Sequence, residues 1–149
     1  VPYLPDMARL EALCTQAYHA ADAVALSPED FAALAGDDFA SLHFILHPSF
    51  RLLQSRFAVA SLWAAHQGVM NIADVDPGLP EDVLIIRPQL AVEVMRAPPG
   101  AGIFFLNVQE GKNLGASVAE ASSASAEFNL AQVMHLMMTS GMVVAAQRA

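Results

Sequence analysis

The spacing of apolar residues predicts a helix at the start of the chain. Leu10, Leu13 and Ala17 follow one another at intervals of three or four residues, as on the buried face of a helix. Pro5 suits a first helical turn, and Asp6 places a negative charge near the helix N-terminus, where it is stabilising. We therefore expect a helix that begins near Pro5.

A second helix and a strand are predicted next. Ser27, Pro28 and Asp30 have the spacing of a helix start, in which Ser27 caps the helix and Pro28 occupies its first turn. Apolar and polar residues then alternate over 39–46, as in a half-buried strand. Pro48 ends that strand because proline has no N–H for a ladder.

Residues 50–57 are expected to form another extended segment, and 59–67 a short helix that contains Trp63. Residues 68–81 (GVMNIADVDPGLPE) show neither helical nor strand periodicity and contain an Asp-Pro-Gly turn signal. This stretch is predicted to be a linker between two subdomains.

After the linker the pattern changes to a hairpin followed by helices. The apolar runs 83–86 and 90–95 flank Arg87-Pro88-Gln89 and predict two strands joined by a tight turn. Three helices and a short strand should follow, over 102–109, 114–122, 129–141 and 142–146.

The expected fold class is therefore α+β. Residues 1–67 should form a subdomain of helices with a short β segment, and 68–81 a linker. Residues 82–149 should form a winged-helix-like subdomain, since a hairpin, three helices and a short strand have that order. A small α+β unit of no named type is the alternative.

Composition limits the function. The chain has 149 residues, of which only 15% are charged, and a formal net charge of −8. Hydrophobic residues make up 55%, so disorder is excluded, yet no apolar run approaches the ~20 residues of a membrane span. So few charges leave apolar surface exposed, and such surface usually contacts a partner.

Neither a metal site nor a nucleophile emerges from the sequence. His43 and His47 are four apart, but on an extended segment, where they would not share a helix face. Cys14 lies in an apolar helical stretch that favours an inert thiol, and as a single cysteine it fits a reducing cytoplasm. We therefore expect no catalytic residues, no metal and no cofactor.

The sequence argues against DNA binding by this part of the chain. The helix over 129–140 would be the recognition helix of a winged helix, and it contains no Lys or Arg. Phosphate contacts need such cations, and base edges are read mostly by Arg, Asn or Gln. The helix offers Gln132, His135 and several methionines instead.

A peptide-binding surface suits these residues better. An exposed strand edge can accept an extended peptide as an added strand. Met134, Met137 and Met138 could line an adaptable groove because methionine side chains are flexible. The alternative is that this stripe packs into the core, which we expect for most of it, with one or two side chains left accessible.

Two stretches resemble a known family. Residues 3–11 (YLPDMARLE) with 17–22 (AYHAAD) are similar to the opening signature of HvfC/BufC-type proteins. Residues 46–49 (LHPS), followed by Ser55-Arg56-Phe57 and Trp63, are similar to a second motif of that family. The similarity runs through nearly all of the chain.

The resemblance implies a longer protein and a partnership. Family members are about twice this length and begin with a helical region catalogued as DNA-binding, so the present chain is expected to be a C-terminal portion. They act beside multinuclear non-haem iron oxidases, and the pair modifies cysteines of ribosomally made precursor peptides.

The resemblance also implies a binding site for the leader segment of the precursor peptide. Small winged helices of such pathways hold the leader along the hairpin edge and the third helix. Carried over to this chain, the peptide-binding positions are Leu90, Val92, Val94, Val133, Leu136 and Met137.

The leading hypothesis is a non-catalytic, cytoplasmic adaptor that presents a precursor peptide to the oxidase during natural-product maturation. A DNA-binding transcription regulator is the alternative, and an enzyme with a metal or cofactor is a third. Basic residues in an upstream segment would favour the second hypothesis, and metal analysis of the pure protein would test the third.

Overall fold

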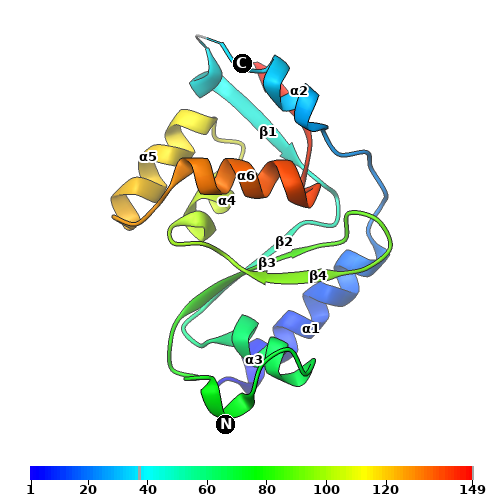
Figure 1. Ribbon diagram of the computed structural model, residues 1–149, viewed down its shortest axis with the longest axis vertical. Coiled ribbons are helices and arrows are strands. Elements are labelled where there is room, and N and C mark those ends of the chain that lie inside the picture. The colour runs from blue at the N-terminus through cyan, green and yellow to red at the C-terminus, as the bar shows by residue number, and fades with distance from the viewer. Residues whose placement is uncertain (37, 149) are drawn as a thin grey trace.

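A computed structural model describes residues 1–36 and 38–148 and shows a mixed α+β fold (Figure 1). Asp37 and Ala149 lie outside the described residues. The helices of the described part are α1 (Leu4–His19), α2 (Pro28–Ala33), α3 (Val59–His66), α4 (Ala101–Gln109), α5 (Leu114–Ala124) and α6 (Leu130–Ser140). Its strands are β1 (Leu42–Leu46), β2 (Arg51–Ser55), β3 (Glu81–Ile86), β4 (Glu93–Arg96) and β5 (Val143–Arg148).

The strands form two antiparallel sheets. One sheet has the order β2-β3-β4, and the other pairs β1 with β5. The last strand thus lies beside the first one, in a different sheet from the predicted hairpin. Both sheets join strands from before and after residues 68–81, a stretch that contains a short 3₁₀ turn over Ile72–Asp74.

Strand β3 lies between two hydrophobic cores. Leu84 and Ile86 belong to the first core. Besides β3, this core is built from α2, α4, α5, α6 and β1. Val83 and Ile85 point to the opposite face and belong to the second core, with α1 and α3. All four side chains are fully buried. Each core therefore draws on both predicted parts, 1–67 and 82–149.

Local signals predicted the helices well. Ser27 and Asp30 form a reciprocal capping box at the start of α2, as their spacing indicated. The side chain of Asn129 caps α6, and Gly141 ends that helix with a φ of 76°, a left-handed conformation that glycine adopts without steric cost. These ends depend on contacts within a few residues, which a sequence pattern records directly.

The predicted hairpin is wrong in its turn and in its second strand. Pairing ends at Ile86↔Glu93, so the connection runs over 87–92 and β4 begins three residues later than expected. Leu90 and Val92 therefore lie in the loop. The Arg87 side chain explains why pairing ends early, because its guanidinium donates to the Gln89 carbonyl and to the Ala17 and Ala20 carbonyls at the end of α1.

The strand predicted over 39–46 is also shorter than expected, since a 3₁₀ turn occupies Phe39–Ser41.

Candidate peptide-binding groove

Strand β4 is the edge of its sheet. Helix α6 lies above β4 in Figure 1 and runs in roughly the opposite direction. Within residues 1–36 and 38–148 no strand pairs with the outer side of β4. The Ala97 N–H donates to the Asp82 carbonyl at 2.8 Å, just beyond the end of β4. Hydrogen bonds alternate along an antiparallel pair, so the N–H groups of Val94 and Arg96 point outward. This edge can accept an added strand.

A hollow of about 580 Å³ lies where the C-terminal end of β4 meets the start of α6. Its lining includes Asp82, Arg96, Gly100 and Gln132. Asp82 packs tightly against the first turn of α4, where a Cβ added to Gly102 would meet its Oδ2 at 1.9 Å. Burial raises the pKa of Asp82, and a hydrogen bond to the Gln54 side chain acts in the opposite direction.

A second hollow, of about 510 Å³, lies at the other end of β4. Gln89 and Glu93 line it from the strand side, and Thr139 and Ser140 from the last turn of α6. Residues 23–25 also line it. The two hollows are thus each bounded by the β3–β4 hairpin region and α6, and they lie toward opposite ends of β4, with the half-buried Met95 and Leu136 between them.

The middle of the groove is apolar. Leu136 lies on the same face of α6 as Gln132 and Thr139, because these residues are four and three positions apart. It is half-buried and packs against the first core, as does Met95 of β4. The groove, defined here as the space between β4 and the Gln132–Leu136–Thr139 face, therefore has an apolar centre with polar ends.

The six residues predicted for peptide binding are not brought together in one place. Val133 and Met137 are 0% and 1% exposed and belong to the first core, so a peptide cannot reach them in this conformation. Val92 and Val94 pack against the second core, on the face of the sheet away from α6. Leu90 is 89% exposed in the loop, and Leu136 borders the groove.

Sequence reasoning missed the polar residues of the groove. Glu93 sits between valines within a strand, where an acidic residue looks like an ordinary solvent-facing position. Asp82 stands at the start of a strand, where a carboxylate gives no functional signal, and Gln132 and Thr139 become neighbours of the hairpin only through packing. The period of α6 does place Gln132 and Thr139 on one face, which is the signal that could have indicated them.

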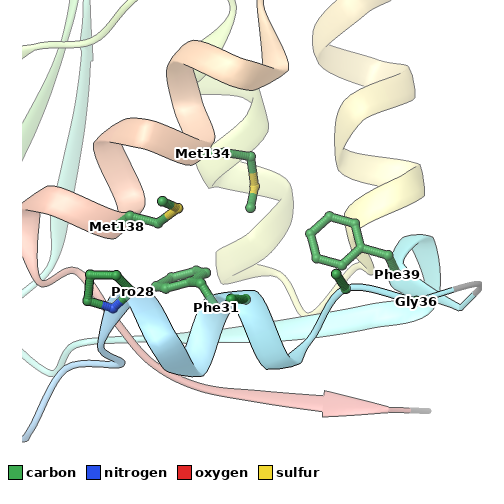
Figure 2. Close-up of a pocket in the computed structure, with 8 residues that line it drawn as sticks. Pro28, Phe31, Gly36, Phe39, Met134 and Met138 are labelled. Carbon is green, nitrogen blue, oxygen red and sulfur yellow. The ribbon is translucent and has the colours of Figure 1, made fainter.

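A separate apolar cavity of about 450 Å³ lies between α2 and α6. Figure 2 shows Met134 and Met138 of α6 projecting toward Pro28 and Phe31 of α2, with Phe39 at the far end. These two methionines are half-buried, whereas Met137 lies in the core. The methionine stripe is therefore divided: Met137 is buried, while Met134 and Met138 pack against the first core and stay partly exposed in the cavity. Two accessible side chains agree with the expectation, but full burial of most of the stripe does not.

The His47-Pro48-Ser49 stretch joins the two sheets. The Ser49 backbone N–H donates to His47 Nδ1 at 3.0 Å, and Ser49 Oγ accepts from the Arg87 backbone N–H at 2.9 Å. The His47 backbone N–H donates to the Met142 carbonyl at 2.7 Å, next to β5. These contacts hold β1, β3 and β5 together at one point, which gives this family-like motif a structural role.

His47 is expected to make the stability of the fold depend on pH. Burial lowers its pKa, the nearby Arg87 charge lowers it further, and the Ala23 carbonyl and Asp22 oppose the shift. Below a pH of about 6.5 an unfolded histidine binds a proton that the folded one resists, so the unfolding free energy should fall as the pH drops. The slope from this group is at most about 1.4 kcal/mol per pH unit.

Urea unfolding between pH 7.5 and 5.5 would measure that slope. His47→Asn is the matched variant, because its amide oxygen can still accept the Ser49 N–H. The variant should show a shallower pH dependence than the natural protein over this range. If the unfolding free energies of the two proteins change equally with pH, the lowered pKa of His47 is contradicted.

Other candidate chemistry is sparse. In the described part of the chain no group of three or more His, Cys, Asp or Glu side chains is placed to hold a metal ion. Cys14 is half-buried, and burial together with the Glu11 charge raises the pKa of its thiol, which suppresses the reactive thiolate. His43 Nδ1 lies 2.8 Å from the Gly111 carbonyl, a hydrogen bond between β1 and the turn that follows α4.

Among the described residues, none of the helices has both the length and the hydropathy needed to cross a bilayer.

Comparisons with known proteins do not identify a family for this chain. No family model matches the chain, and the search of curated proteins found no match either.

Proposed function

We propose that this protein is a non-catalytic adaptor that binds a ribosomally made precursor peptide and presents it to a multinuclear non-haem iron oxidase for cysteine modification. The observation that carries the proposal is the open edge of β4 beside α6. Backbone N–H and C=O groups on such an edge bind an extended peptide irrespective of its sequence, and the flanking helix selects its side chains.

The resemblance to HvfC/BufC-type proteins supplies the partner and the peptide class. In this proposal β3, β4 and α4–α6 act as a winged-helix variant, and the leader segment of the precursor lies between β4 and α6. Leu136, with the backbone of Val94, would contact the peptide directly. Val92 and Leu90 would shape the loop that leads into the groove. The setting would be the cytoplasm, where the oxidase and the precursor are made.

Charge distinguishes this function from DNA binding. Helix α6 carries no Lys or Arg, and the whole chain has a net charge of −8. A recognition helix would need cations near phosphates, and their absence from α6 removes the main source of DNA affinity.

Calorimetry with the leader peptide of a precursor encoded beside this gene tests the proposal. We expect a dissociation constant of about 100 µM or below, which corresponds to a binding free energy of at least about 5.5 kcal/mol. The protein should also co-elute with the neighbouring oxidase in gel filtration. Absence of binding heat together with failure to co-elute would reject the adaptor function.

A proline in β4 tests the mode of binding. Arg96→Pro removes an outward N–H, and edge strands tolerate proline where that group faces solvent, so the fold should persist. Loss of one hydrogen bond, worth about 0.5–1.5 kcal/mol, should weaken peptide binding by about two- to tenfold. Arg96→Gln is the control, since it removes the same charge but keeps the N–H. Equal affinities for the two variants would exclude strand addition at this position.

A further inference from the structure

The two hollows of the groove each contain one carboxylate on the α6 side of the sheet. Glu93 lines the hollow beside Thr139, and Asp82 lines the hollow beside Gln132. Side chains of Met95 and Ala97 pack toward the first core, so by strand alternation Glu93 points to that same side. Leu84 and Ile86 do likewise on β3, and Asp82 is in phase with them.

The register of the sheet fixes the spacing between these carboxylates. Val83 pairs with Arg96, so Asp82 lies opposite Ala97, whose N–H donates to the Asp82 carbonyl. Glu93 and Ala97 are four residues apart, which is about 13 Å along a strand. Since Ala97 has a short side chain, a long side chain from an added strand can cross it and enter the hollow next to Asp82.

Few cations compete for these two groups. Arg96 Nη1 lies 3.7 Å from Glu81 Oε2, so its charge is shared with a second acidic residue. The Asp82 carboxylate packs against the first turn of α4 and is hydrogen-bonded to the neutral side chain of Gln54. Arg87, near the other hollow, is engaged by the Asp22 carboxylate and by backbone carbonyls. Each hollow is therefore lined by one more acidic than basic side chain.

Resting on the proposed function, we infer that the bound segment carries two basic side chains four residues apart, with an apolar side chain midway between them. In an extended peptide, residues at positions 1, 3 and 5 of such a segment point to the same face. The two basic groups then meet Glu93 and Asp82, and the apolar one meets Met95 and Leu136. The pattern reads the same in both strand directions, so it holds for a parallel or an antiparallel added strand.

Three fluorescein-labelled peptides of equal length test this inference by anisotropy. The first, TTKTLTKTT, has the expected spacing. The second, TTKTLKTTT, has the same composition, but its lysines are three apart and point to opposite faces of a strand. The third, TTETLTETT, has the same spacing with opposite charge. We expect the first to bind about three- to tenfold tighter than the second, since it alone gains both ion pairs, and the third to bind weakest.

Charge-removing variants locate the contacts. Glu93→Gln and Asp82→Asn should each weaken binding of the first peptide by about three- to tenfold and reduce its salt dependence. Glu110→Gln removes the same charge from an exposed position at the end of α4, outside both hollows, and should leave the affinity unchanged.

The outcomes separate this inference from the proposed function. Equal binding of the three peptides, or unchanged affinity in both groove variants, would overturn the basic pattern. If the leader peptide binds all the same in calorimetry, the adaptor function remains. Failure of all three peptides to bind would also overturn the pattern, and the leader titration then decides separately whether the adaptor function stands.

Discussion

Arg87→Met should lower the free energy of unfolding by about 3–5 kcal/mol, because it removes the guanidinium donor from one buried and two part-buried backbone carbonyls. The guanidinium is almost fully buried, with 7% of the side chain exposed. It donates to the carbonyls of Ala17 at 3.0 Å, Ala20 at 2.5 Å and Gln89 at 2.6 Å. The bonds to Ala17 and Ala20 reach carbonyls at the C-terminal end of α1, where few intrahelical donors remain.

The charged partner of Arg87 provides the matched control. Asp22 lies 2.8 Å from Nη1, but its side chain is 89% exposed. Water can replace it, so Asp22→Asn should cost less than about 1 kcal/mol. Arg87→Lys should resemble Arg87→Met, because one ammonium cannot reproduce the planar fork that reaches several carbonyls. Urea denaturation measures the free energy of unfolding of all three variants. If Arg87→Met lowers it by less than about 1 kcal/mol, the carbonyls that Arg87 binds must find other partners.

Single alanine substitutions on β3 should each cost about 2–5 kcal/mol, although the two side chains face different cores. Leu84→Ala opens a cavity in the first core, and Ile85→Ala opens one in the second. Both side chains are 0% exposed, so the surroundings can relax only partly. Leu90→Ala, at an 89% exposed position of the adjoining loop, is the control and should change stability by less than about 0.5 kcal/mol.

Strand β3 should also couple the two cores into one unfolding transition. Its backbone is hydrogen-bonded to β2 on one side and β4 on the other, so neither core can open without disturbing it. Tryptophan fluorescence reports on Trp63, which packs against the second core, while far-ultraviolet circular dichroism reports on the helices of both. Coincident curves are expected for the natural protein and for both variants. Separate transitions would mean that the two cores fold independently.

Helix positions were largely predictable because their signals are local. The capping box at Ser27, the side-chain cap at Asn129 and the left-handed glycine at position 141 all act within one or two turns. The end of the hairpin was not predictable, since it depends on Arg87 reaching α1, about 70 residues earlier in the chain. Strand partners β1 and β5 are separated by about a hundred residues, and no short pattern records such a pairing.

The candidate site shows the same division. The apolar stripe of α6 was visible, but the helix is apolar on more than one face, so periodicity alone could not separate buried Met137 from accessible Met134 and Met138. Likewise, Val92 and Val94 alternate as strand residues should, but which face of the sheet meets α6 depends on where the helix docks.

By itself, the sequence determined the α+β class, the helix boundaries, the low charge and the lack of cations on α6, because composition and short-range spacing carry this information. Only the tertiary structure decided that β3 is shared by two cores and that β4 is left as an open edge beside α6. It also placed Glu93 and Asp82 at the two ends of one groove. Such contacts join residues far apart in the chain, and they form only when whole helices and sheets pack together.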